Sequence, residues 1–403
     1  MSANPIMGVL YHWIGGLAAA SFYIPYRQVK RWSWETYWLV GGIFSWIVMP
    51  ALMASILVPG FWSVLNSTPH KVLMYAYLFG ALWGIGGLTF GLTMRYLGIA
   101  LGMSVALGYT AIFGTLIPPI AQHQIGKILS GDSGHYIILG VLVSFIGIAV
   151  SGLAGMSKEK ELTPSQKTST ITEFHFGKGM LIATFSGIMS SCMAFGLDAG
   201  TPINKLAVKL LHSEGGSSIW QGLPVLVIVL LGGFTTNFIW CAILSFKHRS
   251  TGEYAGKYSL GENMSDTGYE TEFSAAEAIS PLDTDELKER SSLVSKTLVT
   301  SSVKSGQQKN PLLNNYLFAA LAGILWYLQF FFYQMGQAQL GKAFIFANWT
   351  IHMSSIMIFS MLWGIALKEW RGTSSRTHKL IAVGLFLLVS STVIIGYANK
   401  LTG

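Results

Sequence analysis

The stretch VLMYAYLFGALWGIGGLTFGLTM, residues 72–94, decides the fold. Its 23 residues include no Asp, Glu, Lys or Arg. A helix needs roughly 20 such residues to cross a hydrocarbon core of about 30 Å. Polar and apolar residues do not alternate along it, as they would in the strands of a membrane barrel. The pattern therefore predicts a transmembrane helix.

Nine further stretches have the same character. They lie at 6–26, 37–59, 99–121, 136–156, 179–199, 220–246, 315–340, 343–367 and 380–399. Only 11% of the 403 residues are charged, against about 25% in a typical soluble domain. This deficit excludes an ordinary soluble enzyme. We predict an all-α integral membrane protein with ten transmembrane helices.

Basic residues are divided unequally between the two sides of the predicted membrane. The loops after the odd-numbered spans hold 20 of the 26 Lys and Arg residues. Loops rich in Lys and Arg stay in the cytoplasm, so we expect both termini to lie outside, in the periplasm. The net charge of +8 then reflects orientation in the bilayer and requires no nucleic acid partner.

Two segments differ in composition from the spans. Residues 157–178 predict a cytoplasmic linker. Residues 247–311 are rich in Ser, Thr, Gly and Glu and poor in large apolar side chains. Such a composition cannot bury enough apolar surface to fold alone, so we expect a disordered cytoplasmic insert.

The two halves of the chain carry an internal repeat. A shift of 243 residues aligns Gly80 with Gly323, Trp83 with Trp326 and Leu97 with Leu340, and a shift of 244 aligns Gly140 with Gly384. The first span matches the sixth more weakly, with Gly8 on Gly179 and Gly16 on Gly187. Each repeat contains five spans, and an odd number forces the second copy to run upside down. Inverted repeats are typical of secondary transporters, whose substrate site lies near mid-membrane. We predict one repeat at 1–156 and a second at 179–399, the latter interrupted by the insert.

Polar and aromatic side chains gather near the middle of several spans. These candidate substrate-binding residues are Trp83, Trp326, Gln329, Tyr333, Asn348, His352 and His12. The spacing i, i+3, i+7 or i, i+4 puts those of each helix on one face. Amide and imidazole groups bind hydroxyls and rings cover apolar C–H faces, so this set suits a small neutral sugar. Interhelical hydrogen bonding and core packing are the structural alternatives.

Proton coupling needs a group that gains and loses a proton during transport. His352 and His12 have unperturbed pKa values near neutral pH. Asp198 is the only charged residue inside a span, and Glu35 lies at the mouth of the second. For Asp198 a solvated helix end, and for Glu35 an interfacial ion pair, are alternative interpretations.

Several motifs resemble those of a known family. They are KRWSWET at Lys30–Thr36, GGIFSWI at Gly41–Ile47, FGALWGIG at Phe79–Gly86, GLTMRYLG at Gly91–Gly98, WYLQFFFY at Trp326–Tyr333, IHMS at Ile351–Ser354 and LKEW at Leu367–Trp370. They are similar to those of the bacterial L-rhamnose–proton symporter family, a ten-span branch of the drug/metabolite transporter superfamily. The resemblance covers the chain except for the insert.

This resemblance implies import of L-rhamnose or a related deoxy-sugar with a proton, by alternating access, across the bacterial inner membrane. A transporter or exporter of the same fold acting on another small metabolite or drug is the alternative. We expect no enzymatic activity, no cofactor and no metal site, since no paired carboxylates or nucleophile–base pair share one leaflet. The two cysteines, Cys192 and Cys241, lie within apolar runs and predict no disulfide framework.

Overall fold

The computed structural model describes residues 4–97, 99–123, 126, 131–161, 175–257, 311–340 and 345–400. Within these ranges the chain is helical and contains no strand. Nine helices are long and apolar enough to cross a membrane. Most of the predicted insert, residues 258–310, and residues 162–174 of the predicted linker lie outside the described residues.

The described residues of the first half of the chain form nine helical segments. Their bounds are α1 Pro5–Ser21, α2 Tyr23–Tyr26, α3 Trp34–Ile43, η1 Phe44–Val48, α4 Met49–Leu57, α5 Phe61–Asn66, α6 His70–Leu97, α7 Ile99–Ala121 and α9 Asp132–Glu161. The second half contains α11 Phe176–Ala199, α12 Thr201–Ser213, η2 Ser218–Trp220, α13 Leu223–His248, η3 Ser250–Ala255, α16 Leu312–Gln339, α17 Ile345–Ala366 and α18 Ser375–Lys400.

Nine of the ten predicted spans coincide with the nine long apolar helices. The tenth, at 99–121, forms α7, whose apolar stretch in the described residues is the shorter Val105–Ala121. A helix of 23 residues rises about 35 Å, so α7 is long enough to cross a hydrocarbon core.

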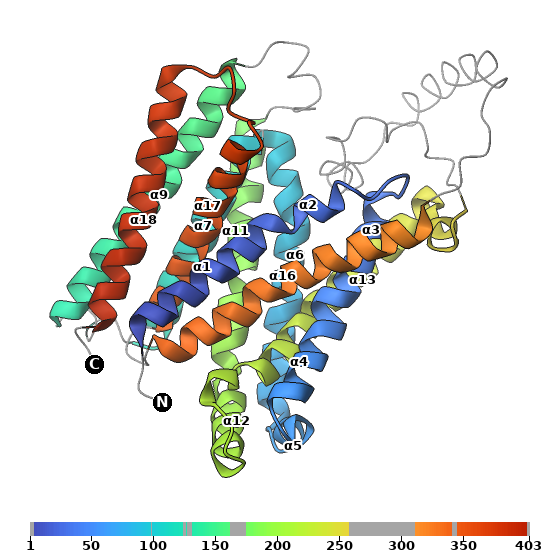
Figure 1. The fold of residues 1–403 in the computed structure, drawn as a ribbon, viewed down its shortest axis with the longest axis vertical. Coiled ribbons are helices and arrows are strands. Elements are labelled where there is room, and N and C mark those ends of the chain that lie inside the picture. Colours follow the sequence, from blue (N-terminus) through green and yellow to red (C-terminus); the bar gives the residue numbers. More distant parts are fainter. Residues whose placement is uncertain are drawn as a thin grey trace.

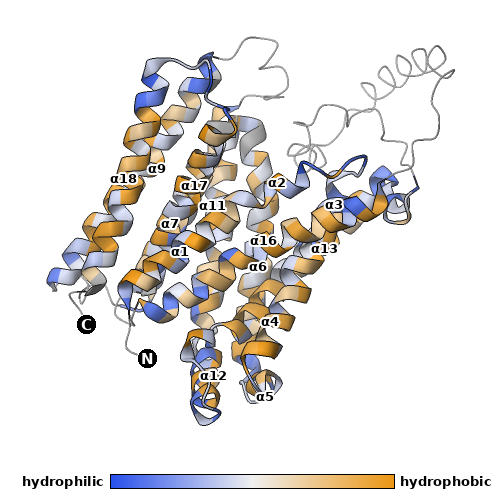
Figure 2. Ribbon diagram, in the orientation of Figure 1, coloured by the Kyte–Doolittle hydropathy of each residue, from blue (hydrophilic) through white to orange (hydrophobic). Residues whose placement is uncertain are grey.

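The long helices form one bundle, with α9 and α18 on one flank and α3, α4 and α13 on the other (Figure 1). α1 and α16 cross between the flanks, and α1 begins at the same end of the bundle at which α18 ends (Figure 1). Hydrophobic residues follow the lengths of the helices, and hydrophilic ones concentrate at their ends (Figure 2). Large apolar side chains such as Ile146, Phe238 and Phe386 are 55%, 46% and 70% exposed, as expected of a surface that faces lipid.

The second span is not a regular α-helix. Residues Phe44–Val48 adopt a π-helical turn between α3 and α4, and Pro50 follows at the start of α4. Single π-helical turns frequently mark functional sites. This one turns Ser45 and Trp46 into the protein interior, where both are buried.

Helix contacts occur in matched pairs. α1 packs against α16 and α17, and α11 packs against α6 and α7. Likewise α6 packs against α13, and α16 packs against α3. α9 and α18 pack against each other. Exchanging the two halves of the chain converts the contact of α9 with α18 into itself and each of the other contacts into another one of them.

Single glycines follow the same pairing. A Cβ placed on Gly8 would lie 2.5 Å from Leu340 Cγ, and one placed on Gly179 would lie 2.5 Å from Leu97 Cγ. The sequence repeat aligns Gly8 with Gly179 and Leu97 with Leu340. Small residues let transmembrane helices approach closely, and here they do so at corresponding places.

The glycines that begin the repeat alignment show the same symmetry. A Cβ on Gly80 of α6 would lie 2.8 Å from the carbonyl carbon of Val229 in α13. A Cβ on Gly323 of α16 would lie 2.8 Å from the carbonyl carbon of Gly41 in α3. Both positions therefore place one helix backbone directly against another.

Candidate functional site

Five buried polar and aromatic side chains from three helices meet in the middle of the bundle. We call this set the central polar cluster: His12 of α1, Gln329 and Tyr333 of α16, and Asn348 and His352 of α17. α1 packs against both other helices, so the cluster lies where the three meet. The sequence predicted all five of these residues.

Tyr333 contacts both histidines. Its ring centroid lies 5.1 Å from that of His12 and 5.1 Å from that of His352. The two imidazole centroids lie 5.9 Å apart. The side chain of Asn348 lies beside His12. Residues about 340 positions apart in the chain therefore form one compact group.

Two glycines make room for the imidazole rings. A Cβ on Gly336 of α16 would lie 2.8 Å from both Cδ2 and Nε2 of His12. A Cβ on Gly15 of α1 would lie 3.4 Å from Cε1 of His352 and 2.9 Å from the carbonyl oxygen of Gln329. Larger residues at either position would displace the cluster.

Most polar atoms of the cluster have no protein partner. Both ring nitrogens of His352 and Nε2 of Gln329 are buried without a hydrogen bond among the described residues, and the buried polar atoms of His12 and Asn348 have at most each other as partners. Leaving a buried polar group unpaired costs about 1–3 kcal/mol. Such a concentration of unpaired donors and acceptors is expected where a polar ligand completes the hydrogen bonds.

Several polar groups on the helices around the cluster, by contrast, are paired. Ser355 Oγ lies 2.9 Å from the carbonyl oxygen of His12 and 2.7 Å from that of His352. Thr115 and Thr350 share a hydrogen bond of 2.7 Å, and the indole of Trp349 donates to the Thr110 carbonyl at 3.1 Å. These bonds join α7 to α17 and α17 to α1, and so position the cluster.

The cluster is closed to solvent in this conformation. His12 and His352 are 0% exposed, Asn348 is 1%, and Gln329 and Tyr333 are 3% exposed. A ligand could reach these groups only if the helices around them moved apart.

The remaining two predicted residues, Trp83 and Trp326, lie elsewhere. They belong to an aromatic cluster formed by Phe22, Trp38, Trp46, Trp83, Trp326 and Phe330. Phe330 contacts both tryptophans, with centroids 5.5 Å from Trp83 and 6.3 Å from Trp326. Along α16, the predicted stripe thus begins in the aromatic cluster at Trp326 and ends in the central polar cluster at Tyr333.

A small cavity adjoins the aromatic cluster. Its volume is about 10 Å³, and Trp38, Trp46, Ser45 and Trp326 are among its walls. This is room for about one water molecule. The π-helical turn supplies Ser45 and Trp46, so the irregular part of the second span lines this space.

Glu35, a predicted coupling residue, belongs to a third group. It is 0% exposed and lies at the start of α3. Its Oε1 accepts a hydrogen bond from Ser250 Oγ at 2.8 Å and lies 3.1 Å from Nδ1 of His248. Ser33 donates to the neighbouring Glu253 from its backbone nitrogen at 2.7 Å and its hydroxyl at 2.6 Å. Burial raises the pKa of Glu253 above its ordinary value.

Asp198 lies at the end of α11 and is partly exposed. Its Oδ2 accepts a hydrogen bond of 2.7 Å from Gln122 Nε2. The negative end of the helix dipole disfavours an anion at this position. The structure therefore separates the four candidate proton carriers into one histidine pair and two carboxylates that have hydrogen-bond partners of their own. Asp198 is near enough to interact electrostatically with Tyr333 of the central polar cluster.

Sequence reasoning missed several residues that shape these clusters. Trp46 belongs to the motif GGIFSWI, and Trp38 lies three residues before that motif begins. Trp349 contacts Tyr333 with a centroid distance of 5.8 Å. The presence of tryptophan near the middle of a predicted span was an available signal. Among the described residues, no group of three His, Cys, Asp or Glu side chains is placed to hold a metal ion.

Long apolar helices in matched contacts around buried, unpaired polar groups define a polytopic membrane transporter. The profile of the family described as L-rhamnose-proton symport protein matches residues 1–260 and 294–400. L-rhamnose-proton symporters of Yersinia pestis (strain Pestoides F) and Yersinia pseudotuberculosis serotype O:1b (strain IP 31758) are 33% identical over 391 residues, 97% of this chain and 97% of each relative. The chain belongs to the L-rhamnose–proton symporter family.

This membership confirms the resemblance predicted from the motifs. The family is one of transporters and not of enzymes. With nine helices long enough to span a bilayer in the described residues, the chain is a multi-pass protein of the bacterial inner membrane.

Proposed function

We propose that this chain imports L-rhamnose together with a proton, with the sugar bound at the central polar cluster. The relatives are named for this activity. The observation that carries the assignment of the site is the set of buried ring and amide atoms without hydrogen-bond partners. A neutral sugar presents several hydroxyls, each of which donates and accepts, and would satisfy these atoms without adding charge.

The aromatic cluster would form the next part of the sugar pathway. Its indole and phenyl rings offer apolar faces to the C–H groups of a sugar ring. Trp326 and Tyr333 are seven residues apart on α16, so the two clusters are separated by about 10 Å along that helix. A substrate leaving the histidines would therefore meet Trp326 next.

His12 and His352 would carry the coupled proton. Neutral imidazole can accept a hydrogen bond from a sugar hydroxyl, and protonated imidazole donates from both nitrogens. With the rings 5.9 Å apart, two positive charges would repel each other strongly in a dry interior. The pair would thus hold at most one proton, which matches the uptake of one charge with a neutral sugar. Glu35 and Asp198 already have protein partners and are the alternative carriers.

Alternating access would use two inverted five-helix repeats, 1–156 and 179–399, with α7 as the tenth span and both termini outside. The matched contacts of Gly8 with Leu340 and of Gly179 with Leu97 support this arrangement. So does the position of the start of α1 and the end of α18 at one end of the bundle (Figure 1), which requires an even number of crossings. The central polar cluster draws on α1 from the first repeat and on α16 and α17 from the second.

Uptake of labelled L-rhamnose by purified protein in liposomes tests the proposal. We expect an inward proton gradient to accelerate uptake, and His352→Ala and Gln329→Ala to abolish it while the protein still inserts. His135→Ala, an exposed histidine at the start of α9, is the matched control. Wild-type uptake by both cluster variants would show that the cluster is only packing, and transport of a different sugar alone would overturn the substrate.

A second measurement assigns the proton. Glu35→Gln and Asp198→Asn are assayed with and without the gradient, beside His12→Gln. We expect the two carboxylate variants to keep proton-driven accumulation and the histidine variant to lose it. Loss of accumulation in Glu35→Gln with normal downhill transport would move the coupling site to the start of α3.

A further inference from the structure

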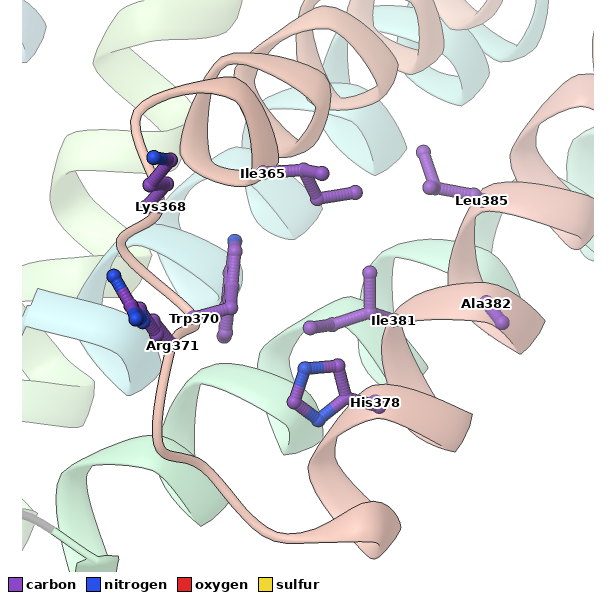
Figure 3. A pocket seen from close by; sticks show the side chains of 8 residues that line it. All are labelled: Ile365, Lys368, Trp370, Arg371, His378, Ile381, Ala382 and Leu385. Atoms are coloured by element: carbon purple, nitrogen blue, oxygen red, sulfur yellow. The ribbon is translucent and has the colours of Figure 1, made fainter.

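A cavity of about 570 Å³ lies where α17 ends and α18 begins (Figure 3). It is far larger than the cavity beside the aromatic cluster, and none of the residues assigned above to transport lines it. Its position at the end of two long helices places it at the depth where lipid headgroups meet the hydrocarbon core.

One part of the cavity wall is apolar. It is formed by Ile365 of α17 and by Ile381, Ala382 and Leu385 of α18, with the ring of His378 at its edge beside Ile381 (Figure 3). Ile365 is 47% exposed, and Phe386, next to Leu385, is 70% exposed. The apolar wall therefore continues into the surface of the bundle that faces lipid.

The other part of the wall is cationic. Lys368 and Arg371 lie on one side of the Trp370 ring, and Ile381 and Leu385 lie on the other (Figure 3). Among the described residues, neither Lys368 nor Arg371 has a carboxylate within salt-bridge distance. The cavity thus presents two positive groups beside an apolar surface.

The nearby carboxylates are already engaged. Glu369 Oε1 lies 3.2 Å from Nη2 of Arg27. Glu161 accepts hydrogen bonds of 2.6 Å from the backbone nitrogen and the hydroxyl of Ser374. Neither acid therefore neutralises the two cations of the wall.

Trp370 separates the two parts of the wall. The Lys158 ammonium lies 4.8 Å from the centroid of its ring, and its Nε1 is buried without a hydrogen-bond partner among the described residues. Tryptophan prefers the level of the headgroups, where one side of the ring is apolar and the other wet. Its position marks the boundary between headgroup and acyl chain.

We propose that this cavity binds one anionic phospholipid, with the phosphate at Lys368 and Arg371 and an acyl chain along Ile365, Ile381 and Leu385. Basic pockets between transmembrane helices bind anionic headgroups. Arginine offers paired N–H donors and lysine a point charge to a phosphate. A free phosphate ion would use the cations only, and a neutral sugar would leave them unused. An anionic lipid fills both parts of the wall.

Thermal unfolding of the purified protein in a neutral detergent tests the site. Phosphatidylglycerol is added to the wild type, to the double variant Lys368→Gln/Arg371→Gln and to the control Arg376→Gln/Lys379→Gln. The control residues are exposed cations of the same helix start and do not line the cavity. Phosphatidylcholine and inorganic phosphate replace phosphatidylglycerol in parallel samples, and native mass spectrometry counts the lipids retained.

We expect phosphatidylglycerol to raise the unfolding temperature of the wild type and the control, with one lipid retained. The affinity of Lys368→Gln/Arg371→Gln for it should fall roughly thirtyfold, since each basic residue near an anionic lipid contributes about 1 kcal/mol. Ala382→Phe, which fills the apolar part and keeps the cations, should also lose the bound lipid.

Three results would overturn the proposal. An equal loss of affinity for phosphatidylglycerol in the control variant would show that the lipid is attracted by the charge of the whole surface and not by this cavity. An equal temperature rise with inorganic phosphate would identify a soluble anion, and an equal rise with phosphatidylcholine would identify apolar packing without recognition of charge.

Discussion

Replacement of Gly323 by alanine tests the packing on which the fold depends. The added Cβ would lie 2.8 Å from the carbonyl carbon and 3.0 Å from the Cα of Gly41, and closer still to its oxygen. Ordinary contacts begin near 3.4 Å. Because every atom it meets belongs to a helix backbone, α16 and α3 must separate by at least about 0.6 Å.

Such a separation is costly. Gaps of 0.5–1 Å forfeit about a quarter to a half of each dispersion contact, and overpacking of a well-packed interior costs about 1–3 kcal/mol. We expect Gly323→Ala to lie at the upper end of this range, near 3 kcal/mol. Gly80→Ala, with the same distances to Val229, should cost as much.

Gly87 provides a matched control on α6. No atom of the described residues lies within 4 Å of a Cβ placed there, and alanine is a better helix former than glycine by about 1 kcal/mol. Gly87→Ala should therefore unfold at or above the wild-type temperature. The assay is unfolding of purified protein in detergent by heat or by a denaturing detergent.

Two outcomes would refute this reasoning. If Gly80→Ala and Gly323→Ala unfold at the same temperature as Gly87→Ala, the close backbone contacts do not stabilise the bundle. If only one of these two variants is destabilised, the corresponding contacts in the two halves do not contribute equally to stability.

Three further predictions concern individual contacts. Gly336→Ala should push the His12 ring aside and lower L-rhamnose uptake by roughly tenfold or more, since displacements of about 1 Å can cost that much; unchanged uptake in liposomes would contradict the assignment of His12. Hydrogen bonds from Ser374 lower the pKa of Glu161 to about 2, so its contact with the start of α18 should stabilise fully above pH 4.5 and be lost as the pH falls toward 2. Hydrogen exchange checks this: the backbone amides of the first turn of α18 should lose protection as the pH falls, and in Glu161→Gln they should be less protected at every pH. Trp38→Phe removes the 3.0 Å bond to buried Asn237 and should destabilise by about 1–3 kcal/mol, whereas Trp62→Phe, 62% exposed, should not.

The positions of the helices were predictable because a bilayer imposes a length and forbids charge. The nine long apolar helices coincide with predicted spans, and their ends differ by only a few residues. The repeat alignment, which matches Gly8 to Gly179 and Leu97 to Leu340, also implied that a contact of Gly179 with Leu97 would recur as one of Gly8 with Leu340, although it did not predict the contact itself.

The candidate site was only partly predictable. The polar residues of α16 and α17 could be identified from the sequence, because lipid offers no hydrogen-bond partner to side chains such as Gln329 and His352. The division of the α16 stripe was not foreseen: Trp326 packs against Phe22 with centroids 4.4 Å apart, while Tyr333 contacts the histidines. Periodicity places residues on one face of a helix, but it does not say how many neighbours that face meets.

Glu35 illustrates the same limit. Its position near Lys30 and Arg31 suggested a local ion pair, but the structure shows it buried beside His248 and Ser250, 213 and 215 residues away. His248 ends α13 and Ser250 begins the short η3 helix, so the turn at Arg249 brings both groups to the start of α3. No local pattern in the sequence encodes this approach.

By itself the sequence determined that the chain crosses a membrane, where it does so and to which family it belongs. The length of each span, its lack of charge and the family motifs are all properties of consecutive residues, so they can be read without the tertiary structure. Only the tertiary structure decided which faces meet. Transmembrane helices are apolar on every side, so their hydrophobic pattern does not separate the side that faces lipid from the side that faces protein. Close backbone contacts at small residues make that choice, and they bring His12 and His352 within 5.9 Å of each other.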